Sequence, residues 1–304
     1  MLFLVGLGVE QSPILEAIEI LKACDDIFFE SYTSPALDSD LMATLLDLTK
    51  KEVQKVSREF VEDGRKILEL SREKKVALVC FGDPLIATTH QELRIRALNK
   101  QIKTKILHGS SILSSLAGEM GLSTYSFGKT VTMTRPPMQY TAYNTIFQNL
   151  LRGLHTTLLL EWDEATNFFL LPKDAIASLL QAENDLKYKV ISEQTLVLVA
   201  SGIGSANIKI TACKFEDSSD QDFGSPPLTL VIPGKLHFTE IEALEAITGK
   251  KAKEFSDNSE GIEKIARQMV TRYSKKTLLA LERAKNAPKG SDRKYKDVFE
   301  NVEL

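Results

Sequence analysis

Short apolar runs alternate with stretches of helical periodicity over the first 110 residues of the chain. The apolar runs predict strands at residues 2–5, 26–30, 52–56, 76–81 and 103–107. Apolar residues at helical spacing predict helices at residues 13–23, 41–48, 61–73 and 90–99. Because strands that alternate with helices are joined by crossovers, this order predicts a parallel sheet with both faces covered.

A second α/β region is predicted over residues 111–249. Its apolar runs predict strands at residues 125–133, 155–160, 195–200 and 228–232. Its periodic stretches predict helices at residues 110–121, 143–152 and 172–181. The predicted fold class is therefore α/β, with one domain at residues 1–110 and another at 111–249.

Residues 250–304 differ from the rest of the chain in charge. They hold 14 Lys or Arg and 9 Asp or Glu, which gives +5 and leaves −8 for residues 1–249. Apolar residues recur at helical spacing from Ile262 to Tyr273, so we expect a long amphipathic helix followed by a basic tail. A solvated helix packed on the body is favoured over a nucleic-acid or ribosome contact, because the charges do not gather on one face.

Composition narrows the function classes. The chain has 304 residues, of which 43% are apolar, and a net charge of −3, so it can bury a core but is not a polybasic binder of nucleic acid or membranes. No apolar run approaches the ~20 residues of a membrane span. The first residues, MLFLVGLG, are too short and uncharged for a signal peptide.

Neither the cysteines nor the histidines show the spacing of a metal site. The three cysteines also lack a disulfide pattern, and this usage fits a reducing cytoplasm. The four histidines are scattered along the chain. We therefore expect no metal.

The sequence Gly6-Leu7-Gly8 follows the first predicted strand, and Glu30 ends the second. This is the outline of a dinucleotide-binding unit, in which glycines approach a pyrophosphate and the acid binds a ribose. Gln11 stands where the third glycine belongs. A tight turn between strand and helix, without a ligand, is the stronger interpretation.

The sequence Gly82-Asp83-Pro84 ends the most apolar of the first strands. Open α/β sheets bind ligands at the carboxyl ends of their strands, so Asp83 on a proline-stiffened loop is a candidate ligand contact. The alternative is a local turn cap without a ligand. Thr88 or Thr89 is predicted to cap the next helix, and the serines at 110–115 to start another.

Nucleophile motifs are absent from the sequence. It has neither a G-x-S-x-G elbow nor a P-loop. A reaction that depends on the reactivity of a cofactor fits this absence.

Six stretches together resemble the diphthine synthases, members of the tetrapyrrole-methylase-like group of S-adenosylmethionine-dependent methyltransferases. They cover most of residues 1–249, and the longest is highly specific. They are LFLVGLG (2–8), FFESYTS (28–34), GDPLIATTHQELRIRA (82–97), SFGKT (126–130), RGLHTTLLLE (152–161) and FGSPPLTLVIPGKLHFTEIEAL (223–244). Residues 250–304 fall outside the resemblance.

The resemblance implies two α/β domains with the cofactor in the cleft between them, bound mostly by backbone and apolar groups. It implies S-adenosylmethionine as the cofactor and S-adenosylhomocysteine as the product. The cofactor-binding positions that it implies are Val9, Asp83, Ile86, Ser111, Ile112, Leu160, Ile203 and Leu228.

The resemblance also implies a reaction and its partners. The methyl acceptor would be the amino group of a 3-amino-3-carboxypropyl-histidine on translation elongation factor 2, giving diphthine by trimethylation. The implied assembly is a homodimer in the cytoplasm. Glu30 and Tyr32 are expected to face the cleft, with Glu30 or water as the proton acceptor. Two alternatives stay open: a methyltransferase of this fold that acts on a small, tetrapyrrole-like molecule, and a non-catalytic module that binds the translation factor.

Overall fold

The computed structural model describes residues 1–35, 41–135, 139–255 and 257–262. Residues 1–258 form one compact unit, which contains two five-stranded sheets. Most of the helix predicted near residues 262–273 lies outside the described residues. Among the residues described, no helix is long and apolar enough to cross a bilayer.

The first sheet is entirely parallel, as the alternation of strands and helices predicts. Its order is β3-β2-β4-β1-β5. The strands are β1 (Leu2–Gly6), β2 (Asp26–Glu30), β3 (Val53–Val56), β4 (Val76–Cys80) and β5 (Thr104–Leu107). Since all strands run the same way, their carboxyl ends meet at one edge of the sheet.

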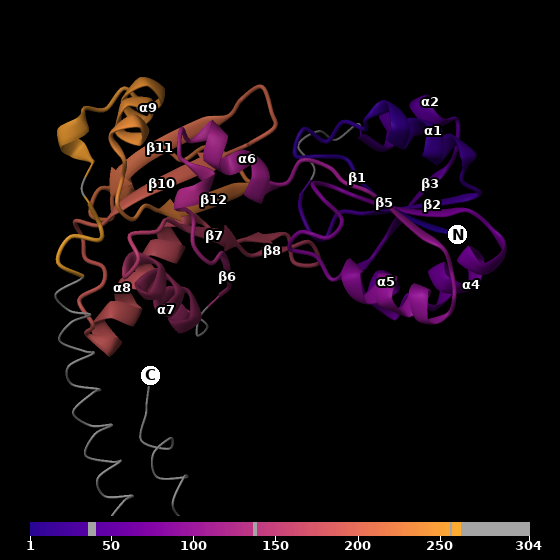
Figure 1. The fold of residues 1–304 in the computed structure, drawn as a ribbon, viewed down its shortest axis with the longest axis horizontal. Helices are drawn as coiled ribbons and strands as arrows, with labels where there is room; N and C mark the ends of the chain where they lie inside the picture. The colour runs from indigo at the N-terminus through magenta and orange to yellow at the C-terminus, as the bar shows by residue number, and fades with distance from the viewer. Residues whose placement is uncertain (36–40, 136–138, 256, 263–304) are drawn as a thin grey trace, which may run out of the picture. The chain divides into compact units, whose positions relative to one another are not determined.

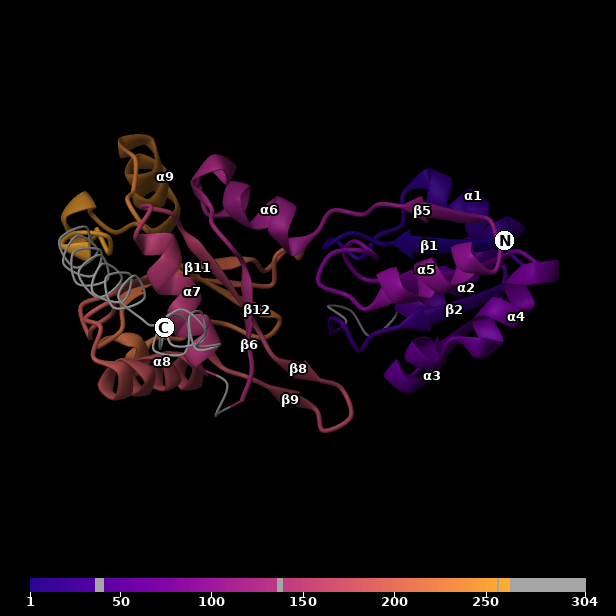
Figure 2. The same cartoon turned by 60° about the horizontal axis from the view of Figure 1, so that its bottom comes forward.

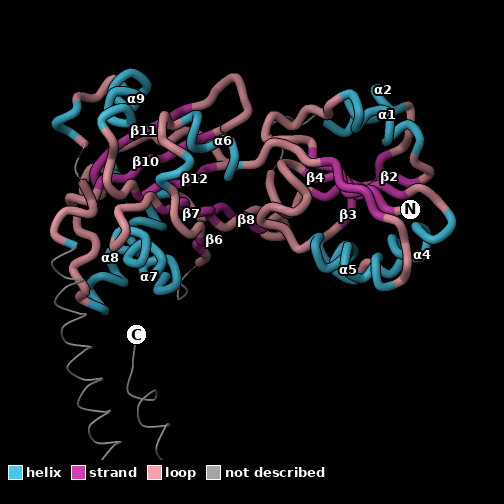
Figure 3. The backbone as a smooth tube through the Cα atoms, viewed as in Figure 1, coloured by secondary structure: helices cyan, strands magenta, loops and turns pink. Residues whose placement is uncertain are grey.

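Helices cover both faces of this sheet, above and below the strands in Figure 3. Val5 and Val79 face α1 (Leu15–Ala23) and α2 (Leu41–Thr49). Leu4 and Leu78 face the opposite core, which is formed with α3 (Arg58–Asp63), α4 (Arg65–Glu73) and α5 (His90–Asn99). Neighbouring strand residues therefore point to opposite cores, which explains the continuous apolar runs.

The single helix predicted at residues 61–73 is wrong, because the structure has two helices there. Gly64 separates α3 from α4 with a left-handed backbone, φ +59°. The guanidinium of Arg96 donates to the carbonyls of Glu62 and Asp63, so it caps the end of α3. A side chain at Gly64 would collide with Arg96 and Leu93.

The second sheet is mixed, with the order β11-β10-β12-β7-β6. Only β6 and β7 pair in parallel, and the other neighbours are antiparallel. The strands are β6 (Val131–Met133), β7 (Thr156–Leu160), β10 (Leu196–Ser201), β11 (Lys209–Lys214) and β12 (Leu228–Ile232). A separate two-stranded hairpin, β8 (Trp162–Asp163) and β9 (Phe168–Phe169), extends from this sheet in Figure 2.

Four helices pack on the second sheet. The helices α6 (Ile112–Glu119) and α9 (Phe238–Thr248) share a core with β10–β12. The helix α8 (Pro172–Leu186) lies on the opposite side from α9 (Figures 1 and 2), and it packs against α7 (Gln139–Leu150). Short 3₁₀ turns complete the fold at η1 (Thr124–Ser126), η2 (Ser218–Asp220) and η3 (Ala252–Glu254).

The second region departs from the sequence analysis in its details. Residues 125–133 are not one strand, because a 3₁₀ turn precedes the short β6. The structure also adds β11, the β8–β9 hairpin and α9. The compact unit continues past residue 249: Phe255 packs in the core of the second sheet, and the Asn258 side chain bonds both backbone groups of Leu196.

Candidate functional site

Glycines at the carboxyl edge of the first sheet bring three loops into backbone contact. The N–H of Gly8 donates to the carbonyl of Gly82 (3.1 Å), and the N–H of Gly82 donates back to Gly8 (2.9 Å). A side chain at Gly109 would collide with both of these backbones. The loops after β1, β4 and β5 are therefore fixed to one another by main-chain packing that only glycine permits.

The first glycine turn does not form a pyrophosphate site. The N–H groups of Leu7, Gly8 and Val9 donate to Cys80 O, Gly82 O and the Ser110 hydroxyl respectively. These three donors are therefore not available to a phosphate. The geometry of Gly6-Leu7-Gly8 is that of a tight turn, and it does not favour the dinucleotide interpretation.

Asp83 is held on both sides of its carboxylate. One oxygen accepts the N–H of Leu85 (2.8 Å), and the other lies 2.6 Å from Nδ1 of His108. The side chain is buried, and it also lies on the wall of a pocket. The turn-cap interpretation of Asp83 is confirmed by the Leu85 bond, and its contact with a ligand stays a prediction.

The pocket is open at its mouth, and its empty space of about 1080 Å³ includes part of the surrounding solvent. All eight positions that the family resemblance implies lie on its wall. Five come from the loops of the first sheet and the start of α6, and three from the second sheet. These residues are Val9, Asp83, Ile86, Ser111, Ile112, Leu160, Ile203 and Leu228.

Ser111 shows how local sequence places part of this wall. Its hydroxyl accepts the N–H of Ser114, and the Ser114 hydroxyl accepts the N–H of Ser111, which is a reciprocal capping box at the start of α6. The hydroxyl-rich start predicted at residues 110–115 is confirmed. The predicted cap of α5 is wrong: Thr89 makes no side-chain bond as its N-cap, and the Thr88 hydroxyl donates to Pro84 O (2.6 Å).

The β8–β9 hairpin supplies a part of the wall that the sequence analysis missed. Trp162 stacks on Phe169 with ring centroids 4.2 Å apart, and both line the pocket. Glu161 lines it as well, and its carboxylate accepts the N–H, Nε–H and Nη2–H of Arg135. The hairpin has only two residues in each strand, so periodicity gave no signal for it.

Hydrogen bonds join the hairpin to the loop after β2. The indole N–H of Trp162 donates to Ser31 O (3.2 Å), and the Ser31 hydroxyl donates to Glu164 (2.6 Å). At another point Gly204, with φ +90°, packs so closely on Val9 that a side chain would collide with the Val9 carbonyl. The walls from the two sheets therefore meet at two places around the pocket.

Glu30 and Tyr32 do not face the pocket, contrary to expectation. Glu30 is fully buried behind the wall, and its carboxylate accepts the N–H (3.1 Å) and the hydroxyl (2.6 Å) of Thr33. Tyr32 turns its hydroxyl to Nε2 of His90 (3.3 Å). Burial raises the pKa of Glu30 to about 7 and lowers the pKa of His90 to about 4, so both groups favour their neutral forms.

Comparisons with known proteins agree with this geometry. The family model of tetrapyrrole (corrin/porphyrin) methylases matches residues 1–218. The diphthine synthase of Methanocaldococcus jannaschii is 37% identical over 253 residues, which cover 81% of this chain and 98% of that protein. The diphthine synthase of Sulfurisphaera tokodaii is 34% identical over 251 residues, 80% of this chain and 97% of that protein.

Solved structures show the same fold. A crystal structure of a diphthine synthase superposes with a TM-score of 0.73 at 26% identity, over 87% of this chain and all of that one. A conserved protein of Aeropyrum pernix superposes with a TM-score of 0.78 at 28% identity, over 89% of this chain and 97% of that one. The match spans both sheets and the loops around the pocket. This chain therefore belongs to the tetrapyrrole (corrin/porphyrin) methylase family, in its diphthine synthase branch.

Proposed function

We propose that this protein uses S-adenosylmethionine to methylate the amino group of the 3-amino-3-carboxypropyl-histidine on translation elongation factor 2. The product is diphthine, formed by trimethylation. Membership of the family makes the chain a methyltransferase, and the proposal adds the cofactor, the acceptor and the number of methyl groups. The observation that carries it is the chemistry of the pocket wall.

That wall suits a cationic sulfonium and an uncharged nucleoside. Its described residues include the carboxylates of Asp83 and Glu161 and no Lys, Arg or His. A phosphate would find no cation there, whereas a positive sulfur is attracted by carboxylate and carbonyl oxygens. The aliphatic side chains of Ile86, Ile112 and Leu160 offer apolar contact to a nucleoside base. The residues present fit S-adenosylmethionine.

The chain's own part in the reaction is binding and alignment. S-adenosylmethionine, when bound, supplies a methyl group on a sulfonium that is a good leaving group. Asp83 is held by Leu85 and His108, so it keeps its position without reorganisation. Placing the acceptor amine in line with the methyl group removes much of the entropic cost of the transfer.

Glu30 is not the group that takes the proton of the acceptor. The amine must be neutral to attack, and Glu30 lies behind the wall with both oxygens bonded to Thr33. Glu161 is the carboxylate that the second sheet brings to the pocket, and Arg135 holds it in place. We assign to Glu161 the electrostatic attraction of the acceptor while its amine is still protonated. Water then accepts the proton of this amine before the methyl transfer.

The proposed partners are elongation factor 2 and a second copy of this chain. A homodimer follows from the family resemblance, and so does a cytoplasmic location, where an elongation factor is present. The three cysteines are free and buried, which is compatible with a reducing compartment.

Mass spectrometry of elongation factor 2 tests the proposal. The factor carrying the aminocarboxypropyl-histidine intermediate is incubated with this protein and S-adenosylmethionine, and the peptide that holds this histidine is weighed. Three methyl increments on that peptide are expected, and a fourth would indicate the methyl ester. Incubation without cofactor is the control. No added mass, with S-adenosylhomocysteine still binding in a titration, would contradict the acceptor and favour a small-molecule substrate.

A further inference from the structure

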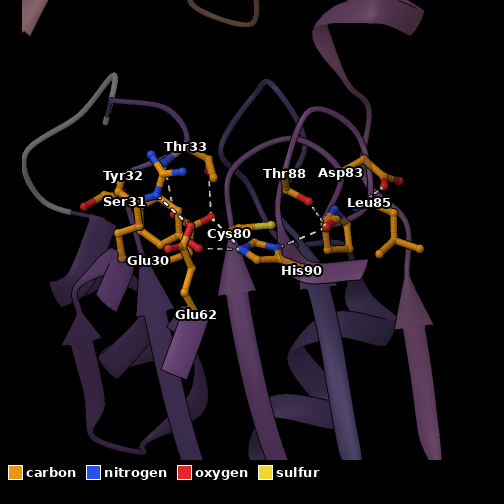
Figure 4. Close-up of polar contacts among 12 residues, drawn as sticks. Glu30, Ser31, Tyr32, Thr33, Glu62, Cys80, Asp83, Leu85, Thr88 and His90 are labelled. Atoms are coloured by element: carbon orange, nitrogen blue, oxygen red, sulfur yellow. Dashed lines mark hydrogen bonds and ion pairs between the residues drawn. The ribbon is translucent and has the colours of Figure 1, made fainter. Parts of the chain in front are cut away.

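The two loops that form one side of the pocket rest on a buried polar cluster. We use this name for the fully buried Glu30 and His90, the half-buried Tyr32 and Thr33, and the carbonyl of Pro84. The cluster lies just beyond the carboxyl ends of the strands (Figure 4). The loop at residues 31–35 and the loop at residues 82–89 both contribute lining residues. They belong to different strands, β2 and β4, so no local sequence fixes one against the other.

One end of the cluster holds the first loop. Glu30 is the last residue of β2 and is fully buried. Its two oxygens accept the N–H and the hydroxyl of Thr33, which closes a turn three residues long. Thr33 lines the pocket, so the carboxyl group of Glu30 sets the position of this part of the wall from behind.

The other end holds the second loop. His90 is the first residue of α5 and is fully buried. Its Nδ1 lies 3.0 Å from Pro84 O, and the Thr88 hydroxyl donates to the same carbonyl (2.6 Å). Pro84 stands between Asp83 and the rest of the loop, so His90 and Thr88 together fix the segment that carries Asp83 and Ile86.

The two ends meet at Nε2 of His90. A carbonyl only accepts, so Nδ1 carries the hydrogen and Nε2 of the neutral ring is an acceptor. Nε2 lies 3.3 Å from the hydroxyl of Tyr32 and 3.5 Å from the carboxyl group of Glu30. Tyr32 belongs to the loop at residues 31–35, and Glu30 is the end of the strand that precedes this loop. A single imidazole therefore connects the two loops.

We propose that the buried polar cluster is a positioning device that couples the two loops and thereby sets the affinity of the pocket for its cofactor. None of its members except Thr33 lines the pocket, so Glu30, Tyr32 and His90 are positioning residues, not catalytic ones. The coupling is a property of the fold, and the identity of the ligand rests on the proposed function.

A metal centre at the same place is the competing interpretation. The ligand atoms of Glu30, Cys80 and His90 lie within 4.8 Å of one another. However, both oxygens of Glu30 are taken by Thr33, and Nε2 of His90 faces Tyr32. Burial holds the pKa of the Cys80 thiol well above its usual value, which disfavours the thiolate that binds metals. A metal would make Cys80 essential, whereas in the coupling proposal it has no role.

Reciprocity gives the test, because each loop must respond to a substitution in the other. Tyr32→Phe removes only the hydroxyl that faces His90. His90→Asn keeps a donor for Pro84 O and removes the group at Nε2. Cys80→Ala is the matched control, since this side chain is equally buried and its thiol donates to the carbonyl of Val5 on β1. Amide hydrogen exchange is measured in the full chain without ligand, and titration gives the Kd of S-adenosylhomocysteine.

Tyr32→Phe is expected to speed amide exchange at residues 82–89 by about ten-fold. His90→Asn is expected to speed exchange at residues 31–35 by about the same factor. Both variants should raise the Kd of S-adenosylhomocysteine by about ten-fold. Both variants should keep the turnover of the wild type at saturating cofactor. The Cys80→Ala variant should match the wild type in hydrogen exchange and in Kd. Faster exchange confined to the substituted loop would overturn the coupling. Stoichiometric zinc in the purified wild type, with Cys80→Ala as damaging as His90→Asn, would overturn it in favour of a metal. Wild type that binds no S-adenosylhomocysteine would contradict the proposed function but not the exchange result.

Discussion

The two sheets build their sides of the pocket in different ways. The first sheet uses parallel strands whose carboxyl ends meet, and its loops are tied by main-chain bonds between glycines and by the buried polar cluster. The second sheet uses a short hairpin held by an aromatic stack and an exposed ion pair. Buried main-chain packing tolerates little change, whereas stacked side chains near solvent can adjust. We therefore expect substitutions in the glycine packing of the first wall to cost folding. Substitutions of side chains that connect loops, in the polar cluster or in the hairpin, are expected to cost binding.

The largest effect on stability is expected from Gly109→Ala, which disturbs the main-chain packing of the first wall. The added methyl group would collide with the backbones of Gly8 and Gly82, and these are themselves paired. We expect a loss of about 3 kcal/mol in the free energy of unfolding, the upper range for overpacking. Urea unfolding of the full chain measures it.

The matched control for this substitution is Gly118→Ala. Gly118 lies inside α6 and has open space around it, so alanine is expected to stabilise the chain by roughly 0.5–1 kcal/mol. Equal stabilities for the two variants would mean that the first wall is as adaptable as the second.

The pH dependence of Glu30 sharpens the comparison further. Its folded pKa, about 7, is above the usual 4.5, so the unfolded chain loses this proton first as pH rises. Stability from Glu30 is complete below pH 4.5 and is lost as pH rises to about 7. The titratable groups around it are Tyr32 on its loop, Cys80 on β4, His90 on α5 and Glu164 on the hairpin.

Glu30→Gln keeps the shape and cannot ionise. The free energy of unfolding of this variant, minus that of the wild type, is expected to grow by roughly 3 kcal/mol between pH 4.5 and pH 7.5. His90, whose lowered pKa acts in the opposite direction, is present in both chains and cancels in this difference. Urea unfolding across this pH range measures it, with the exposed Glu19→Gln as control. A constant difference would mean that folding does not raise the pKa of Glu30.

The same contrast explains what could be predicted from the sequence. All five strands of the first sheet were predicted. The three central strands β1, β2 and β4 gave the clearest signal, since buried parallel strands are continuously apolar. The loops carrying Val9, Asp83 and Ile86 follow directly from those strands. The break at Gly64 was not predicted, because the Arg96 contact that stabilises it comes from a distant helix.

The second sheet was harder to predict because tertiary contacts decide its details. The edge strand β11 pairs only with β10 and carries lysines at both ends, which hide its alternation. The hairpin exists because Trp162 stacks on Phe169, a contact that no local pattern shows. Glu161 and Trp162 were therefore missed as pocket residues. Glu30 was misplaced for a related reason, since its position in the sequence does not reveal that it turns behind the wall.

The smallest effect is expected from Trp162→Phe, which weakens the contact between the hairpin and the loop after β2. Phenylalanine keeps a ring to stack on Phe169 but loses the indole N–H that donates to Ser31 O. One neutral hydrogen bond contributes about 1 kcal/mol, so Kd for S-adenosylhomocysteine should rise about five-fold. Unfolding should change little, because the Ser31 hydroxyl still bonds Glu164. Titration and urea unfolding separate the two quantities, with the exposed Tyr125→Phe as control. A loss of stability with unchanged Kd would show that this bond supports the fold, and the two walls would then differ in strength but not in kind.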